Sequence, residues 1–165
     1  MLQQPAHWLA LGFGSGLAPK APGTFGTLWA WATFVLMQIM GLPLNALWLL
    51  ALLSIPVGWW ACTRTAENMG IPDPGSIVWD EICAFWLILC FVEQALQPSL
   101  LSPYYWALQA IAFALFRFFD AAKPQPVRWA DRAFKGTGWR GGWGIMVDDL
   151  VAALCSVAVL LLFKV

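Results

Sequence analysis

The chain has 165 residues, of which 61% are hydrophobic and only 11% are charged, and its mean hydropathy is +0.70. Soluble domains carry roughly 25% charged residues, so this composition excludes an ordinary soluble domain and indicates an integral membrane protein. The formal net charge is zero, which gives no reason to expect a nucleic-acid partner. A chain of this length suits a single membrane-embedded domain, residues 1–165.

Five apolar segments follow one another along the chain, at residues 25–40, 44–62, 77–92, 104–119 and 145–163. Several are shorter than the roughly 20 residues that cross a hydrocarbon core, unless their charged ends are included. The sequence therefore predicts an all-α membrane bundle of about five transmembrane segments. The stretch at residues 12–27, rich in Gly and Pro, predicts a short N-terminal interfacial or re-entrant segment before the first span.

The connections between these segments differ in charge. Residues 41–43 and 93–103 contain no Lys or Arg, and residues 63–76 contain Arg64. Residues 121–144 contain five bases: Lys123, Arg128, Arg132, Lys135 and Arg140. Because basic connections stay in the cytoplasm, five spans place the N-terminus inside and the C-terminus outside.

Five carboxylates interrupt the apolar pattern at the ends of the segments: Asp80, Glu81, Asp120, Asp148 and Asp149. The expected topology brings all of them to the cytoplasmic face. A charged side chain at bilayer depth costs from about 2.5 to well over 10 kcal/mol, which indicates that these acids have a function. Acids at a helix start gain about 0.3 to 1 kcal/mol from the helix dipole, but this does not account for Asp120 at a helix end.

A hard divalent cation accounts for the acids better, because Mg²⁺ is usually held by one or two carboxylates together with a substrate phosphate. We expect metal ligands among Asp80, Glu81, Asp148 and Asp149, and a catalytic role for all five acids. Within each adjacent pair we expect unequal roles, because neighbouring residues on a helix point about 100° apart. The number of ions, one or two, and the ligand within each pair stay open.

Four residues are candidates for phosphate binding. Lys20 and Thr24 lie in GSGLAPKAPGTFGT, whose glycines allow close backbone approach, although a structural turn explains this stretch equally well. Lys123 and Arg128 follow Asp120; setting the membrane topology is the alternative role for such bases. The Walker pattern is missing, so no nucleotide is expected. Residues 136–144, with five glycines, predict a flexible hinge beside the acids.

Four motifs in this order, GFGSGLAPKAPGTFGTL, GSIVWDE, FRFFDAAKPQPVRWAD and GGWGIMVDDLVA, resemble the phosphatidylglycerophosphatase A family of bacterial membrane phosphatases over nearly the whole chain. The resemblance implies a Mg²⁺-dependent phosphoric monoester hydrolase of the bacterial cytoplasmic (inner) membrane. Its expected substrate is phosphatidylglycerophosphate, met among bilayer lipids at the cytoplasmic face and converted to phosphatidylglycerol, a step of phospholipid biosynthesis. The residues that match the family are Lys20, Asp80, Glu81, Asp120, Lys123, Asp131, Asp148 and Asp149.

Several alternatives stay open at this point. The phosphorus could be attacked by a metal-polarised water or by a carboxylate that forms an acyl phosphate. A small ion- or proton-coupled transporter is the alternative class, because intramembrane acids also serve as proton relays. Transport sites usually lie near the midplane between repeated halves, whereas these acids are expected at one face. Oligomeric state and selectivity against other lipid phosphates do not follow from the sequence.

Overall fold

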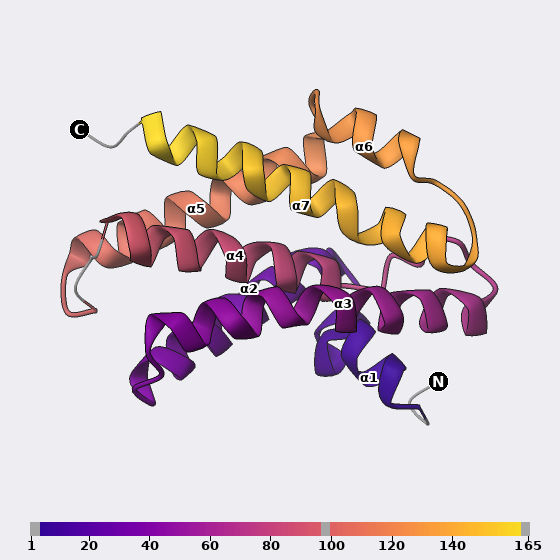
Figure 1. The fold of residues 1–165 in the computed structure, drawn as a ribbon, viewed down its shortest axis with the longest axis horizontal. Coiled ribbons are helices and arrows are strands. Elements are labelled where there is room, and N and C mark those ends of the chain that lie inside the picture. The colour runs from indigo at the N-terminus through magenta and orange to yellow at the C-terminus, as the bar shows by residue number, and fades with distance from the viewer. Residues whose placement is uncertain (1–3, 97–99, 163–165) are drawn as a thin grey trace.

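The computed structural model describes residues 4–96 and 100–162, and within these residues every regular element is a helix. In chain order the elements are α1 (Pro5–Ala10), the 3₁₀ helix η1 (Gly12–Leu17), α2 (Pro22–Ile39), α3 (Leu44–Met69), α4 (Trp79–Leu96), α5 (Pro103–Ala122), α6 (Val127–Ala133) and α7 (Gly138–Leu162) (Figure 1). The all-helical class expected from the sequence is therefore confirmed.

The long helices run back and forth along one axis of the molecule (Figure 1). The end of α2, the start of α3, the end of α4 and the start of α5 lie at one end, on the left of the view, together with the end of α7. The connections from α3 to α4 and from α6 to α7 lie toward the other end, as does α1. This alternation brings the start of α4, the end of α5 and the start of α7 toward the same end of the bundle, although they are far apart in the sequence.

Of the described helices, α3 and α7 are long and apolar enough to cross a membrane by length and composition. The other long helices are shorter or more polar. α4 has 18 residues and includes Asp80, Glu81 and Glu93, while α2 and α5 are diluted by Gly, Thr, Trp and Tyr. Two of the expected spans are thus recognisable by composition alone.

The central helix is α4, because its side chains are buried on every side. Ile82, Phe85 and Leu89 are fully buried, and α2, α3, α5 and α7 all contact α4. Burial on every side is typical of a helix inside a bundle. The start of α4 is held by Trp79, whose indole Nε1 donates a hydrogen bond to the carbonyl oxygen of Ser54 on α3, at 3.1 Å. This contact positions the two acids that follow Trp79.

The largest departures from the expected boundaries are at the end of α3 and at the start of α7. α3 continues to Met69 and ends at Gly70, whose φ of 65° is typical of a helix C-terminus. α7 begins at Gly138, so most of the stretch expected to be a flexible hinge is helical, and that expectation was wrong. The reason is packing: a Cβ at Gly142 would overlap the side chain of Thr63, so glycine lets α7 approach α3 closely. Residue 163, the end of the last expected span, lies outside the described residues.

Candidate active site

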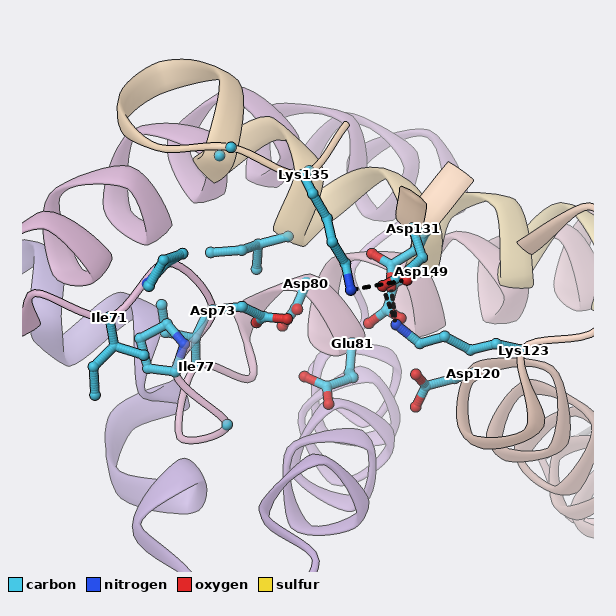
Figure 2. Close-up of a pocket in the computed structure, with 18 residues that line it drawn as sticks. Ile71, Asp73, Ile77, Asp80, Glu81, Asp120, Lys123, Asp131, Lys135 and Asp149 are labelled. Carbon is cyan, nitrogen blue, oxygen red and sulfur yellow. Dashed lines mark hydrogen bonds and ion pairs between the residues drawn. The ribbon is translucent and has the colours of Figure 1, made fainter. Parts of the chain in front are cut away.

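A cavity of about 470 Å³ lies where the start of α4, the end of α5, α6 and the first half of α7 meet the connection from α3 to α4. Figure 2 shows the labelled carboxylates and lysines gathered around it. All five acids singled out in the sequence line this cavity. With two further acids, Asp73 and Asp131, they make seven carboxylates, and only two lysines, Lys123 and Lys135, line the same cavity. Carboxyl groups therefore outnumber amines among the described residues of the lining.

Three of these acids form one tight cluster. Asp80, Glu81 and Asp149 each contribute a carboxylate oxygen, and these oxygens lie within 4.8 Å of one another. Asp149 is only 3% exposed, and the Glu81 side chain is 12% exposed. Among the described residues, Asp80 Oδ1 and Glu81 Oε2 have no hydrogen-bond partner. Carboxylates this close and this buried repel one another strongly, and oxygen ligands that lack partners suit a hard divalent cation.

Asp148 faces a different partner. Its Oδ2 accepts a hydrogen bond from Lys123 Nζ at 2.5 Å, and the same nitrogen donates to Asp131 Oδ1 at 2.8 Å. Lys135 Nζ pairs with the other oxygen of Asp131, at 3.2 Å. The result is an alternating chain of acids and bases along one wall of the cavity, with dashed lines marking its contacts in Figure 2. Asp148 therefore lies outside the cluster of three acids, although it is adjacent to Asp149 in sequence.

Lys123 is held by two carboxylates, those of Asp131 and Asp148. Lys123 follows the last residue of α5 with a left-handed φ of 43°, a conformation that is uncommon in residues other than glycine and that caps the C-terminus of the helix. Burial lowers the pKa of Lys123, but its hydrogen bonds to Asp131 and Asp148 outweigh burial and raise that pKa above the usual value. For Asp131, burial raises the pKa, and the hydrogen bonds from Lys123 and Lys135 lower it below the usual value. Both groups are therefore charged at neutral pH.

Asp120 is paired with Arg117, a residue that the sequence analysis did not single out as part of the site. Arg117 Nη1 lies 2.6 Å from Asp120 Oδ2 and 3.9 Å from Glu81 Oε1. The signal was present in the sequence, because side chains three residues apart on a helix are neighbours and opposite charges at that spacing attract. Asp120 lies near the C-terminal end of α5, where the helix dipole disfavours a carboxylate and favours a cation. The positive charge of Arg117 therefore offsets the unfavourable position of Asp120.

The chain is similar to known phosphatases along almost its full length. A family model described as phosphatidylglycerophosphatase A matches residues 8–164. The chain belongs to the phosphatidylglycerophosphatase A family. The expectation that it is a phosphatase is thereby confirmed.

Three relatives illustrate the phosphatidylglycerophosphatase A match. A protein of that name from Escherichia coli strain K12 is 42% identical over 96% of this chain and 83% of its own length. One of the same name from Haemophilus influenzae is 40% identical over 96% of this chain and 88% of its own length. A relative from Bacteroides thetaiotaomicron, provisionally named a phosphatidylinositol-3-phosphatase, is 37% identical over 90% of this chain and 86% of its own length. No solved structure matches the chain.

Three expected phosphate ligands do not belong to the described lining of the cavity. Lys20 is exposed between η1 and α2, Thr24 is half-buried in the first turn of α2, and Arg128 is exposed on α6. None of the three is among the described residues that line the cavity. The structure therefore brings Lys123 to the acids and leaves Lys20, Thr24 and Arg128 outside, whereas Asp73 and Lys135 line the cavity without having been expected there.

Proposed function

We propose that this member of the phosphatidylglycerophosphatase A family hydrolyses the terminal phosphate monoester of phosphatidylglycerophosphate, releasing phosphate and phosphatidylglycerol for phospholipid biosynthesis. Two relatives that cover nearly the whole chain carry the name of this activity. The observation that carries the proposal is the cavity itself, in which a buried cluster of acids lies beside a constrained lysine. The acid cluster suits a cation, and the ammonium group of Lys123 suits a phosphate oxygen.

The cofactor in this proposal is Mg²⁺, held by Asp80, Glu81 and Asp149. A phosphate monoester carries up to two negative charges and would be repelled by a cavity with seven acids and two lysines. The unpartnered oxygens Asp80 Oδ1 and Glu81 Oε2 are oxygen donors of the type that Mg²⁺ prefers. When bound, Mg²⁺ neutralises negative charge that develops on the phosphate oxygens during the reaction. Asp148 is engaged by Lys123, so we assign it to positioning that lysine rather than to metal binding.

We assign phosphate binding and proton transfer to other side chains of the cavity. Two of the three N–H groups of Lys123 donate to Asp148 and Asp131, which aim the ammonium group, and the third is left to donate to the phosphate. Asp120, fixed by Arg117, borders the same cavity, and we assign to it the role of accepting or holding a proton near the reacting phosphorus. In the reaction the bond from phosphorus to the glycerol oxygen breaks, and that oxygen takes up a proton. The attacking oxygen belongs to water or to a carboxylate.

These two routes are distinguished by rapid acid quenching of a single turnover with a ³²P-labelled terminal phosphate. Radioactivity that stays on the denatured protein and is released by hydroxylamine indicates an acyl phosphate. Label that appears only in free phosphate at every time point indicates direct attack by water.

We further propose a membrane bundle of five spans, α2, α3, α4, α5 and α7, with α1 and η1 at the interface and residues 1–165 forming one domain in a bacterial cytoplasmic membrane. The relatives are bacterial, and α3 carries exposed apolar side chains such as Leu49, Leu52 and Leu53 that suit contact with lipid. The base-rich residues 121–144 lie beside the cavity, so the active site faces the cytoplasm. A reporter fused after residue 165 should be external, and one inserted within residues 135–138 internal. A cytoplasmic C-terminus would exclude this arrangement.

The deciding experiment measures phosphate release by the purified protein in detergent, with phosphatidylglycerophosphate as substrate. We expect turnover with Mg²⁺, loss of turnover with EDTA, and recovery when Mg²⁺ is added in excess. Phosphatidic acid and phosphatidylinositol 3-phosphate serve as comparison substrates, the second because of the Bacteroides relative's name. Turnover that resists EDTA would exclude the metal, and a clear preference for either comparison lipid would exclude the proposed substrate. The alternative class, a transporter, has no support among the relatives, which carry phosphatase names.

A further inference from the structure

Arg117 lies where three helices meet. It projects from the last turns of α5, and its Nη1 approaches Asp120 on the same helix and Glu81 at the start of α4. The same nitrogen donates to Thr27 Oγ1 on α2, at 3.4 Å. The Arg117 side chain is 22% exposed, so these contacts are only partly screened by solvent.

The contacts of Arg117 are directed at the acids and not at the substrate cavity. Glu81 and Asp120 both line the cavity, but Arg117 is not among the described residues that do so. It therefore touches these carboxylates from behind. A substrate in the cavity meets Glu81 and Asp120, and Arg117 acts on it only through them.

The start of α2 forms the support for this arrangement. A Cβ at Gly23 would overlap Glu81 Oε1 and would lie 3.2 Å from Arg117 Nη1, so only glycine leaves space for the carboxylate and the guanidinium at this point. Thr27 is fully buried, and its hydroxyl donates to the carbonyl oxygen of Gly23 at 2.8 Å, which leaves its oxygen free to accept from Arg117. Residues 22–27, the PGTFGT segment, belong to the stretch that the sequence left open as either a phosphate-binding loop or a structural turn, and in the structure they pack against the back of Glu81.

We infer that Arg117 is a positioning residue for the phosphatase reaction: seated on Gly23 and Thr27, it fixes the orientation of Glu81 and Asp120 toward the cavity. Without it, two carboxylates at neighbouring helix ends would repel each other with no cation between them. The inference rests on the proposed function, because it assigns Glu81 to cation binding and Asp120 to the reaction. It also gives the PGTFGT segment a role that does not involve contact with the substrate.

The test compares Arg117→Gln and Arg117→Lys with Arg132→Gln, which removes an exposed arginine on α6 as a matched control. Three quantities are measured for each protein in detergent: kcat and KM for phosphatidylglycerophosphate, the dissociation constant for Mn²⁺ by electron paramagnetic resonance without substrate, and the melting temperature. For Arg117→Gln we expect kcat to fall by at least about 30-fold with KM within about threefold of wild type, the pattern of a lost interaction that does not bind substrate. Arg117→Lys should be intermediate, because lysine keeps the charge but not the planar fork.

The Mn²⁺ measurement separates positioning from a simple effect of charge. If Arg117 orients Glu81, its loss weakens Mn²⁺ binding, and we expect a rise of about tenfold in the dissociation constant, or about 1.4 kcal/mol. If Arg117 acts only as a positive charge near the ion, its loss removes repulsion, and Mn²⁺ binds more tightly. Tighter binding, an unchanged kcat, or a rise in KM alone would each overturn the inference.

Two further outcomes are covered by the design. If Arg117→Gln does not fold, Thr27→Val keeps the arginine and removes one of its acceptors; a fall in kcat of about threefold at unchanged melting temperature is then expected, and wild-type kcat overturns the inference. If the wild-type protein releases no phosphate from phosphatidylglycerophosphate, the proposed function fails by itself. The Mn²⁺ affinities of the Arg117 variants still decide whether Arg117 orients Glu81.

Discussion

The two acidic pairs, Asp80 with Glu81 and Asp148 with Asp149, look equivalent in sequence and are placed differently in the structure. Asp80 and Glu81 lie in the first turn of α4, and both carboxylates reach the same cluster. Asp148 and Asp149 lie well inside α7, which begins at Gly138; Asp149 joins the cluster, and Asp148 contacts Lys123. Position within the helix accounts for the difference.

Neighbouring side chains in a continuous helix diverge by about 100°, so Asp148 and Asp149 cannot ordinarily share one partner. At a helix start the preceding turn is missing, and side chains of the first turn can converge past the helix end. The expectation of unequal roles within each pair stays a prediction: the members of the second pair have different partners in the structure, whereas both members of the first pair reach the cluster. We attribute the difference between the two pairs to their positions relative to the helix starts.

The largest expected effect tests the division within the second pair. Asp149→Asn removes a member of the acid cluster, so we expect kcat to fall by at least about 100-fold, or about 2.7 kcal/mol, and Mn²⁺ binding to weaken strongly. Asp148→Asn leaves the cluster intact and should change the Mn²⁺ dissociation constant by less than about threefold. Mn²⁺ titrations of both variants, read by electron paramagnetic resonance, provide the comparison. Equal losses of Mn²⁺ affinity would mean that both acids bind the ion, and Asp148 would then not be reserved for Lys123.

The second prediction concerns the first pair. Because both carboxylates reach the cluster, Asp80→Asn and Glu81→Gln should each raise the Mg²⁺ concentration needed for half-maximal turnover, by about tenfold and to a similar extent. The measurement is phosphate release across a Mg²⁺ titration at saturating substrate. If one of the two variants keeps the wild-type Mg²⁺ requirement, the first pair is divided like the second, and the explanation from helix boundaries is wrong.

The meeting of the acids could be predicted from sequence, but some of their partners could not. Charges at the ends of apolar segments, combined with the alternation of helix direction, were enough to expect Asp80, Asp120 and Asp149 at one end of the bundle. Lys123 was expected near Asp120 because it follows that residue closely in the chain. In contrast, whether Lys20 faces the acids depends on how η1 packs against the start of α4, which is a matter of tertiary contacts that local pattern does not encode.

The start of α7 was misjudged for a related reason. Residues 136–144 contain five glycines, and each glycine costs a helix interior about 1 kcal/mol relative to alanine. Local propensity therefore favours a loop. In the structure these residues pack closely on α3 and on residues 134–136, and several positions leave no space for a Cβ, for example Gly142 and Gly144. Tertiary packing outweighs propensity here, and the helix start moves away from Asp148 and Asp149.

The third prediction sharpens the role given to Asp148. If Asp148 aims Lys123 at the phosphate, then Asp148→Asn and Lys123→Met should affect the same step, with KM raised by about tenfold in Lys123→Met and by less in Asp148→Asn. The double variant should be no worse than Lys123→Met alone, because residues that act through one contact are not additive. Steady-state kinetics on the four proteins complete this cycle. Additive effects on KM would show that Asp148 acts independently of Lys123.

The smallest expected effect concerns Asp131, which shares Lys123 with Asp148. The pKa of Asp131 is lowered in the folded protein from its usual value of 3.8, so its stabilising contribution is present above that value and is lost as the pH falls through the lower folded pKa. The pKa of Lys123 is raised from 10.5, so its contribution is present below that value and disappears only at higher pH. Between these limits the ion pair is intact. We expect Asp131→Asn to lower the melting temperature at pH 7 by roughly 2–4 °C, the shift that corresponds to 1 kcal/mol in a protein of this size.

As the pH falls below 3.8 and through the lower folded pKa of Asp131, the wild-type carboxyl becomes protonated as well, so the difference in melting temperature between the two proteins should shrink. Thermal unfolding in detergent at both pH values measures it, with Arg132→Gln as the control for a charge change on the same helix. A difference that stays constant across this range would mean that the carboxylate charge of Asp131 does not contribute to stability. In that case Lys123 would be held by Asp148 alone, and the wall of alternating charges would reduce to a single ion pair between the end of α5 and α7.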